Sequence, residues 1–400
     1  MTELASTLRY ASRMDGVGPS ILREFARVTL RPGMISFAGG LPAAELFPVA
    51  ELQAAAVQTL EKYGRSALQY NDTAGNPALR AKIAARMTAA GAPTQGDNIL
   101  VLSGSQQGLE FAAKLFLDPG DVVVCERPTY LGATAAFNSF QARFADVAMD
   151  DDGMVIDELV GVLERNPRSR IIYVVPDFQN PTGKTWSLER RQALVDVANR
   201  FDAIVVEDSP YGALRFEGNH VPPIKAFDTE GRVLFLGTFS KIFCPGFRIG
   251  WLAASDEVVA RFNILKGNAD LHTNSLAQAE LNEYLEMYSI EEHIARIRSL
   301  YRSRRDLMLG IMAEKFPKSI KYNRPAGGMF TWAELPQGVD TRVLMDRALA
   351  RNVAFVPGAP FHAAGGGENT MRLNYSSMPE DRIVTGLDIL AEVLTAELSG

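Results

Sequence analysis

Lys241 is the residue whose surroundings most clearly suggest chemistry. It follows residues 233–236, an apolar run typical of a buried strand. Desolvating an ammonium is costly, but burial and a cationic neighbour suit a lysine that must form an imine, because they lower its pKa. Thr238 and Ser240 precede the lysine and Arg248 follows it, and such side chains bind phosphate. A Schiff-base lysine among phosphate ligands is what pyridoxal phosphate requires, whereas a surface-loop lysine is the simpler alternative.

Other apolar runs predict further buried strands that end in polar residues. They cover residues 99–102, 122–125, 171–175 and 203–211. Strand–loop–helix units repeat from about residue 95 to 255, which favours an α/β fold with a mostly parallel sheet and helices on both faces. Because parallel sheets present ligand groups at the carboxyl ends of their strands, we expect the polar residues to gather at one edge.

The small polar loop at residues 103–108 joins the first of these strands to a helix expected over residues 109–117. A helix start offers free N–H donors and the positive end of a dipole, so this loop is a second candidate phosphate site. It matches neither a dinucleotide-binding glycine motif nor a Walker loop. Helix capping without a ligand is an equally simple interpretation.

Four side chains lie at or just beyond the ends of the remaining strands. Tyr130 could stack on an aromatic ring, or be structural. Asn180 precedes a proline, which holds it out of the helical region and would aim its amide at a site. Asp208 suits the pyridinium nitrogen of the cofactor, with a helix N-cap as the alternative. We choose Asp208 over Glu207 because Tyr211, three residues on, could reach the ring hydroxyl.

The second half of the chain predicts a smaller unit. Residues 290–315 form a long amphipathic helix that we interpret as a connector. Arg372 lies between apolar neighbours in a short strand at residues 371–376. An inward arginine binds a carboxylate, and a structural salt bridge is the alternative. Near the N-terminus, the paired glycines at residues 39–40 would allow the backbone to approach another group closely. A plain turn is the alternative interpretation.

Composition excludes several other classes of protein. The chain has 400 residues, 47% hydrophobic and 22% charged, so two domains are expected. A net charge of −6 argues against nucleic acid or an anionic membrane as the main partner. The two cysteines, Cys125 and Cys244, are too few for a disulfide framework, and neither lies in a spacing typical of metal ligands. This favours a reduced, cytoplasmic protein. We see no signal peptide and no run of about 20 apolar residues that could span a membrane.

Taken together, these motifs resemble the fold-type I pyridoxal-phosphate aminotransferases over nearly the whole chain. The subgroup that the chain resembles most is that of the 2-aminoadipate and kynurenine aminotransferases (class I/II). The stretches that carry the resemblance are residues 36–42, 103–109, 179–183, 207–211 and 240–251. The resemblance implies the aspartate aminotransferase fold, with a mostly parallel, seven-stranded sheet and a smaller α+β domain.

The resemblance also implies a role for each candidate residue. Lys241 would bind the cofactor as a Schiff base and shuttle a proton, Asp208 would pair with the pyridine nitrogen, and Tyr211 and Asn180 would contact the ring oxygen. Tyr130 would stack on the ring. The phosphate ligands would be Ser105, Gln106, Thr238, Ser240 and Arg248, with Tyr70 reaching the phosphate of the partner subunit. The substrate would be bound by Arg372 and Asn180 at its α-carboxylate, by Gly40 against its body, and by Arg23 at a second carboxylate.

The resemblance further implies a homodimer with shared active sites. We expect an N-terminal arm with a substrate-covering helix (residues 1–45, with the helix at 20–28), a large cofactor-binding domain (46–290) and a small C-terminal domain (291–400). Some relatives carry a winged-helix domain and act as regulators, but residues 1–39 are too few for one.

The expected reaction is ping-pong transfer of the amino group of an L-amino acid to 2-oxoglutarate. The donor could be 2-aminoadipate, an aromatic amino acid or kynurenine, or a branched-chain amino acid. Two alternatives stay open: a lyase or decarboxylase on the same fold, and a non-catalytic cofactor-binding module.

Overall fold

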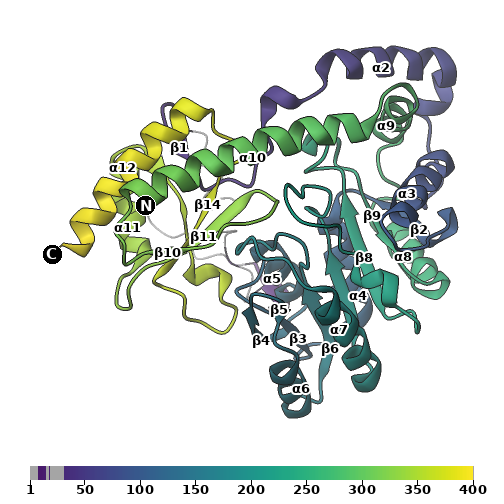
Figure 1. Ribbon diagram of the computed structural model, residues 1–400. Helices are drawn as coiled ribbons and strands as arrows, with labels where there is room; N and C mark the ends of the chain where they lie inside the picture. The colour runs from purple at the N-terminus through teal and green to yellow at the C-terminus, as the bar shows by residue number, and fades with distance from the viewer. Residues whose placement is uncertain (1–7, 15–17, 19–30, 400) are drawn as a thin grey trace.

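The computed structural model describes residues 8–14, 18 and 31–399 of the chain (Figure 1). The helix expected over residues 20–28, and Arg23 within it, lie outside these described residues. Among the described helices, none is long and apolar enough to cross a membrane.

A large twisted sheet forms the centre of the first two thirds of the chain (Figure 1). Its strands are β2 (Ile99–Leu102), β3 (Val122–Arg127), β4 (Arg143–Asp150), β5 (Gly153–Met154), β6 (Ser169–Val174), β7 (Ile204–Asp208), β8 (Val233–Thr238) and β9 (Gly250–Ala253). Their order is β2-β9-β8-β7-β6-β3-β4-β5. All pairings are parallel except those of β9 and β5. The mostly parallel sheet is therefore confirmed, with the two-residue β5 added to the expected seven strands.

Helices cover both faces of this sheet. They are α3 (Pro77–Ala89), α4 (Ser105–Phe116), α5 (Leu131–Asn138), α6 (Ile156–Arg165), α7 (Leu188–Phe201) and α8 (Asp256–Ala269). Alternate strand residues feed two separate cores: Val205 belongs to the cluster under α6 and α7, and Val206 to the cluster on the opposite face. Side chains alternate along a strand, so Glu207 and Asp208 also point to opposite faces.

The helix after β2 begins earlier than the sequence suggested. We expected its start at Leu109, but α4 starts at Ser105. The reason is Gly104, whose φ of +86° turns the chain from strand to helix within two residues. The polar residues of this loop therefore form the first turn of the helix.

A second, antiparallel sheet lies in the C-terminal third. Its order is β10 (Lys321–Tyr322), β11 (Phe330–Glu334), β14 (Thr370–Asn374) and β13 (Val356–Pro357). The remaining helices are α2 (Val49–Tyr63), α9 (Ser275–Met287), α10 (Ile290–Lys315), α11 (Thr341–Ala350) and α12 (Glu380–Leu398). The 26-residue α10 runs from the large sheet to the small one (Figure 1).

The N-terminal segment packs against the C-terminal part of the chain. The strand β1 (Ile35–Ser36) pairs in parallel with β12 (Val353–Ala354). Arg304 of α10 adds ion pairs to Glu45, in the segment after β1, and to Glu380 at the start of α12. These contacts fix the backbone around Gly40 between the two sheets.

Candidate active site

A cavity of about 360 Å³ opens at the carboxyl ends of the large-sheet strands and reaches β11 and β14. Parallel strands deliver their C-terminal residues to one edge, which explains the gathering of polar groups. Predicted residues that line it are Gly40, Ser105, Gln106, Tyr130, Asn180, Asp208, Tyr211, Thr238, Ser240, Lys241, Arg248 and Arg372. The structure therefore brings these side chains together, as expected from the sequence.

Asp208 supplies a buried carboxyl with a free oxygen. It ends β7 and is 3% exposed. The hydroxyl of Tyr173 donates a hydrogen bond of 3.0 Å to Oδ2, whereas Oδ1 is buried and has no hydrogen-bond partner among the described residues. Burial raises the pKa of this carboxyl to about 7, against the opposing effects of the Tyr173 hydrogen bond and of Lys241. Because Asp208 ends a strand and faces the cavity, it is not a helix N-cap.

Lys241 lies in the cavity and not on an outer loop. Its Nζ donates a hydrogen bond of 2.7 Å to the carbonyl oxygen of Gly40. Burial, followed by the charges of Arg372 and Arg248, lowers the pKa of the amine to about 8, although Asp208 acts in the opposite direction. A larger fraction of neutral amine is therefore present near neutral pH than for an ordinary lysine.

One end of the cavity has the features of an anion cradle. The α4 helix begins there with no side-chain cap, so its first N–H groups face the cavity edge. Across from it, Thr238 Oγ1 donates a hydrogen bond of 2.9 Å to Ser240 Oγ. Arg248 comes so close to Gly104 that a Cβ there would lie 2.4 Å from Nη2. Gly104 is thus required for this approach of the guanidinium to the helix start.

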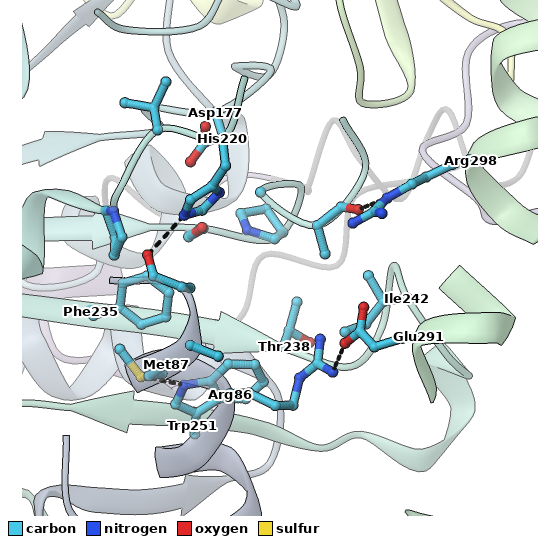
Figure 2. A pocket seen from close by; sticks show the side chains of 18 residues that line it. Arg86, Met87, Asp177, His220, Phe235, Thr238, Ile242, Trp251, Glu291 and Arg298 are labelled. Atoms are coloured by element: carbon cyan, nitrogen blue, oxygen red, sulfur yellow. Dashed lines mark hydrogen bonds and ion pairs between the residues drawn. The ribbon is translucent and has the colours of Figure 1, made fainter. Parts of the chain in front are cut away.

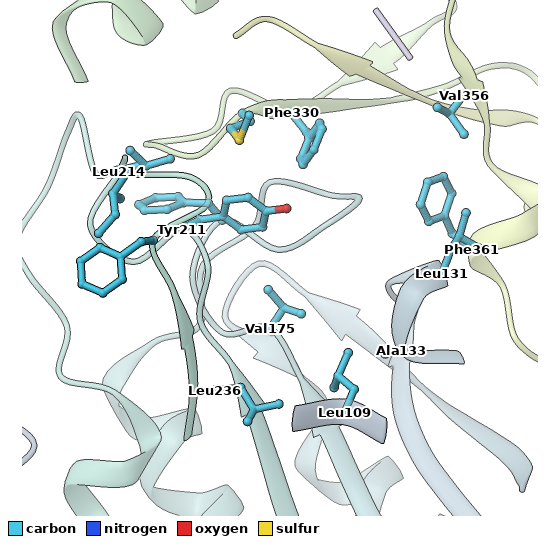
Figure 3. Packing of buried hydrophobic residues seen from close by; sticks show 14 of the residues in the cluster. Leu109, Leu131, Ala133, Val175, Tyr211, Leu214, Leu236, Phe330, Val356 and Phe361 are labelled. Atoms are coloured by element: carbon cyan, nitrogen blue, oxygen red, sulfur yellow. The ribbon is translucent and has the colours of Figure 1, made fainter. Parts of the chain in front are cut away.

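Arg372 forms the opposite end of the cavity. It is 3% exposed, and it donates hydrogen bonds to Asn180 Oδ1 (2.7 Å) and to the Ala38 carbonyl oxygen (2.6 Å). Its guanidinium carbon lies 4.2 Å from the ring centre of Phe330 and 5.2 Å from that of Phe361. Figure 3 shows both rings.

No carboxylate lies within ion-pair distance of Arg372 among the residues that the structure describes, and its Nε has no hydrogen-bond partner there. Burial lowers the pKa of this side chain to about 10. The alternative of a structural salt bridge is therefore not supported. A guanidinium in this state is prepared to receive an anion from outside the chain.

Two tyrosines and an amide lie between these ends. Asn180 Nδ2 donates a long hydrogen bond of 3.4 Å to the hydroxyl of Tyr211. The Tyr211 ring meets Phe330 edge to face, with ring centres 5.9 Å apart (Figure 3). Burial raises the pKa values of both Tyr211 and Tyr130, that of Tyr130 to about 12, so both stay protonated.

Two predicted residues are not placed in this cavity. Tyr70 is 78% exposed and contacts His272 edge to face, away from the cavity lining. Its predicted contact is with the partner subunit, so that role stays a prediction. Arg23 lies outside the described residues.

Sequence reasoning missed several neighbours of the site. Tyr173 was available as a signal, because a tyrosine in a buried aliphatic strand needs a partner for its hydroxyl. Phe330 and Phe361 gave no comparable signal, since their place beside Arg372 depends on long-range packing. Gly104 was signalled only by its position between a strand and a helix.

The residues present fit pyridoxal phosphate. The unpartnered Oδ1 of Asp208 is a site for a protonated ring nitrogen, and the cradle of the α4 start, Ser240 and Arg248 is a site for a phosphate. Lys241 lies in the same cavity. Within the described part of the chain, no group of three or more histidine, cysteine or acidic side chains is arranged to bind a metal ion.

Comparisons with known proteins agree with this geometry. The family model "Aminotransferase class I and II" matches residues 34–390. Aromatic-amino-acid aminotransferase 1 of Thermococcus litoralis is 42% identical over 394 residues, which cover 97% of this chain and 94% of that protein.

Two solved structures extend the comparison. Kynurenine aminotransferase of Pyrococcus horikoshii, in complex with PMP and with kynurenine as substrate, is 40% identical with a TM-score of 0.92, and 98% of each chain is covered. LysN of Thermus thermophilus, an alpha-aminoadipate aminotransferase with bound N-(5'-phosphopyridoxyl)-L-leucine, is 38% identical with a TM-score of 0.91 and the same coverage. The chain belongs to the class I and II aminotransferases, which are fold-type I enzymes that use pyridoxal phosphate.

Proposed function

We propose that this aminotransferase moves the amino group of an L-amino acid to 2-oxoglutarate by a ping-pong mechanism. The observation that carries the proposal is the arrangement of three groups in one cavity: the lowered-pKa amine of Lys241, the free oxygen of Asp208 and the unpaired guanidinium of Arg372. When bound, pyridoxal phosphate supplies an electron sink for negative charge that develops at the substrate Cα.

Asp208 and Lys241 have complementary tasks in this proposal. The Oδ1 of Asp208 would accept a hydrogen bond from the ring nitrogen and keep that nitrogen protonated, while Tyr173 orients the carboxylate through Oδ2. Lys241 Nζ would hold the cofactor and, once free of it, would move the proton of the substrate Cα. An amine with a pKa near 8 can both accept and return a proton near neutral pH.

Arg372 and Asn180 bind the substrate α-carboxylate. The two side chains are joined by a 2.7 Å hydrogen bond, which holds the guanidinium plane. Two ring faces beside Arg372 keep water away and strengthen its attraction for an anion. A carboxylate fixed there directs the Cα–H bond toward Lys241.

The other lining residues hold the cofactor. Tyr211 and Asn180 would hydrogen-bond the ring hydroxyl, Tyr130 would stack on the ring, and Gly40 would lie against the substrate. The phosphate is bound by Ser105, Gln106, Thr238, Ser240 and Arg248.

The assembly and compartment are also proposed. Tyr70 would reach the phosphate of a second copy in a homodimer, which is supported by its exposure and by the exposed apolar Leu68 beside it. Cys125 and Cys244 are buried and unpaired, which supports a reduced, cytoplasmic protein. The division into residues 1–45, 46–290 and 291–400 stays a proposal, and it is supported by the two sheets and by α10 between them.

The donor class is proposed from the relatives. Those named above act on aromatic amino acids, kynurenine and 2-aminoadipate, and branched-chain donors belong in the same test. If Arg23 binds a second carboxylate, Arg23→Ala should raise the KM for 2-aminoadipate but not for leucine. Equal effects on both donors would refute that role.

A donor screen tests the proposed reaction. Holoenzyme is mixed with each L-amino acid and 2-oxoglutarate, and glutamate formation is measured. Glutamate from a few donors supports the proposal and names the substrate class. No glutamate from any donor, despite a lysine-bound cofactor in the absorbance spectrum, would favour a lyase or decarboxylase, and no product of any kind would favour a non-catalytic module.

A further inference from the structure

A second cavity, also of about 360 Å³, adjoins the active site (Figure 2). It is bounded by the end of α3, by residues 209–223 and by the start of α10. Pro210 and Thr238 line both cavities, so the two share a wall. This volume lies within the roughly 300–1,000 Å³ typical of small-molecule sites.

Two aromatic side chains line the second cavity on the side of the large sheet. Phe235 and Trp251 are stacked, with ring centres 6.4 Å apart and an angle of 30° between their planes. The indole N–H already points to Met87 Sδ, at 3.3 Å. Phe235 and Trp251 are each 7% exposed, and both line the cavity. These ring faces can stack against a planar arene without leaving a polar group unsatisfied.

The rim carries one uncompensated positive charge. Arg86 forms an ion pair with Glu291 (Figure 2), and Asp177 forms ion pairs with two arginines that do not line the cavity. Arg298 donates one hydrogen bond, from Nε to the carbonyl oxygen of Ala213 at 2.6 Å. Among the residues that the structure describes, no carboxylate is within 4.0 Å of it, so its terminal nitrogens are available at the rim.

We propose that this cavity is a second ligand site, separate from the substrate site, for a planar aromatic carboxylate. The arene stacks over Trp251 and Phe235, and the carboxylate takes two parallel hydrogen bonds from Arg298. A cation is disfavoured by Arg298, and a neutral arene leaves that guanidinium without an anionic partner. The inference does not depend on which amino acid the active site accepts.

Binding of 2-naphthoate to the full-length holoenzyme tests this site. Isothermal titration and tryptophan fluorescence quenching are measured in the Arg372→Lys background, which removes the strongest carboxylate ligand of the active site. We expect Arg298→Gln to weaken binding roughly ten- to hundredfold, the range of a charged hydrogen bond. Arg302→Gln, an exposed arginine one turn along α10 and outside the lining, is the matched control and should bind normally.

Two further probes and a second variant complete the test. The neutral analogue 2-naphthalenemethanol should bind weakly and equally to Arg298→Gln and its parent, and the non-planar adamantane-1-carboxylate should bind more weakly than 2-naphthoate. Ala90→Phe, checked for folding by circular dichroism, should fill the cavity and abolish binding. Unchanged 2-naphthoate affinity in Arg298→Gln, or binding that disappears with Arg372→Lys alone, would overturn the proposal.

Discussion

Glu207 and Asp208 are neighbours on β7 that show two different uses of a buried carboxyl. Glu207 is 0% exposed and Asp208 is 3% exposed, and burial raises the pKa of each to about 7. Both oxygens of Glu207 accept backbone hydrogen bonds of 2.8 Å, from Ile224 and Lys225. In Asp208 only Oδ2 is bonded, and Oδ1 lies free at the cavity.

The same contrast separates two buried arginines. Arg191 is bonded to both oxygens of Asp177 and to three backbone carbonyl groups. Arg372 has no carboxylate partner in the described part of the chain and keeps a free Nε. Because an unpartnered buried polar group is costly, its presence indicates a partner from outside the chain. Equal burial therefore does not identify a functional residue. Other side chains, such as those of Arg80 and Arg215, also keep a buried Nε without a hydrogen-bond partner among the described residues. The free atoms of Asp208 and Arg372 point to function because they line one cavity.

Exchanging the two carboxyls for amides should separate their roles most strongly. Asp208→Asn keeps the shape but cannot hold a ring nitrogen in its protonated form, so we expect kcat to fall roughly 10²- to 10⁴-fold. Steady-state kinetics at saturating cofactor, with cofactor content checked by absorbance, measures this. The comparison fails if Glu207→Gln loses as much activity as Asp208→Asn.

The two arginines should differ in the same way. Arg372→Lys loses the planar pair of donors, and we expect the KM for the amino acid to rise about 10- to 100-fold. Arg191→Lys should leave KM unchanged and instead lower the midpoint of urea unfolding. An unchanged KM in Arg372→Lys would place the carboxylate elsewhere.

Glu207→Gln should cost stability and not catalysis. The glutamine amide places an N–H opposite one of the two backbone N–H donors, so one buried hydrogen bond is lost. We expect the free energy of unfolding to fall by about 1–3 kcal/mol. Urea denaturation at pH 8, where the carboxylate of the parent is largely ionised, measures the difference. A variant as stable as the parent would show that the bonds to Ile224 and Lys225 do not hold this loop.

The last comparison concerns pH. Asp208 has a folded pKa of about 7 against an ordinary value of 3.8, so between these values the folded apoprotein binds more protons than the unfolded chain. The contribution of Asp208 to the free energy of unfolding therefore falls as pH rises from about 4 to about 7. Asp208→Asn should make this fall shallower in urea titrations of the apoprotein at pH 5 and pH 7.5. Identical slopes in the two proteins would contradict the raised pKa.

Much of the site could be predicted because residues at the ends of parallel strands gather at one edge of the sheet. Asn180 and Lys241 follow buried strands and Asp208 ends one, and parallel strands end at one edge. Alternation along β7 also implies that Glu207 and Asp208 face opposite ways. Which of the two faces holds the cavity depends on the loops that pack over each face, and local sequence does not contain that information.

The remaining features arise from contacts between distant parts of the chain. Phe330 and Phe361 meet Arg372 through the small sheet and its connections. The early start of α4 results from the positive φ of Gly104, which is an ordinary glycine in the sequence. The second cavity is formed by α3, residues 209–223 and α10, which are far apart in the sequence. No single sequence motif therefore predicts that Arg298 lines it.

The most direct test of the account is turnover by Lys241→Ala. The variant should keep its circular dichroism spectrum and its unfolding midpoint, because the Lys241 side chain has only one hydrogen bond within the described residues, to Gly40. Glutamate formation from 2-oxoglutarate should disappear with every donor that the parent accepts. Retained transamination by the folded variant would contradict the assignment of Lys241 as the amine that binds the cofactor and moves the proton.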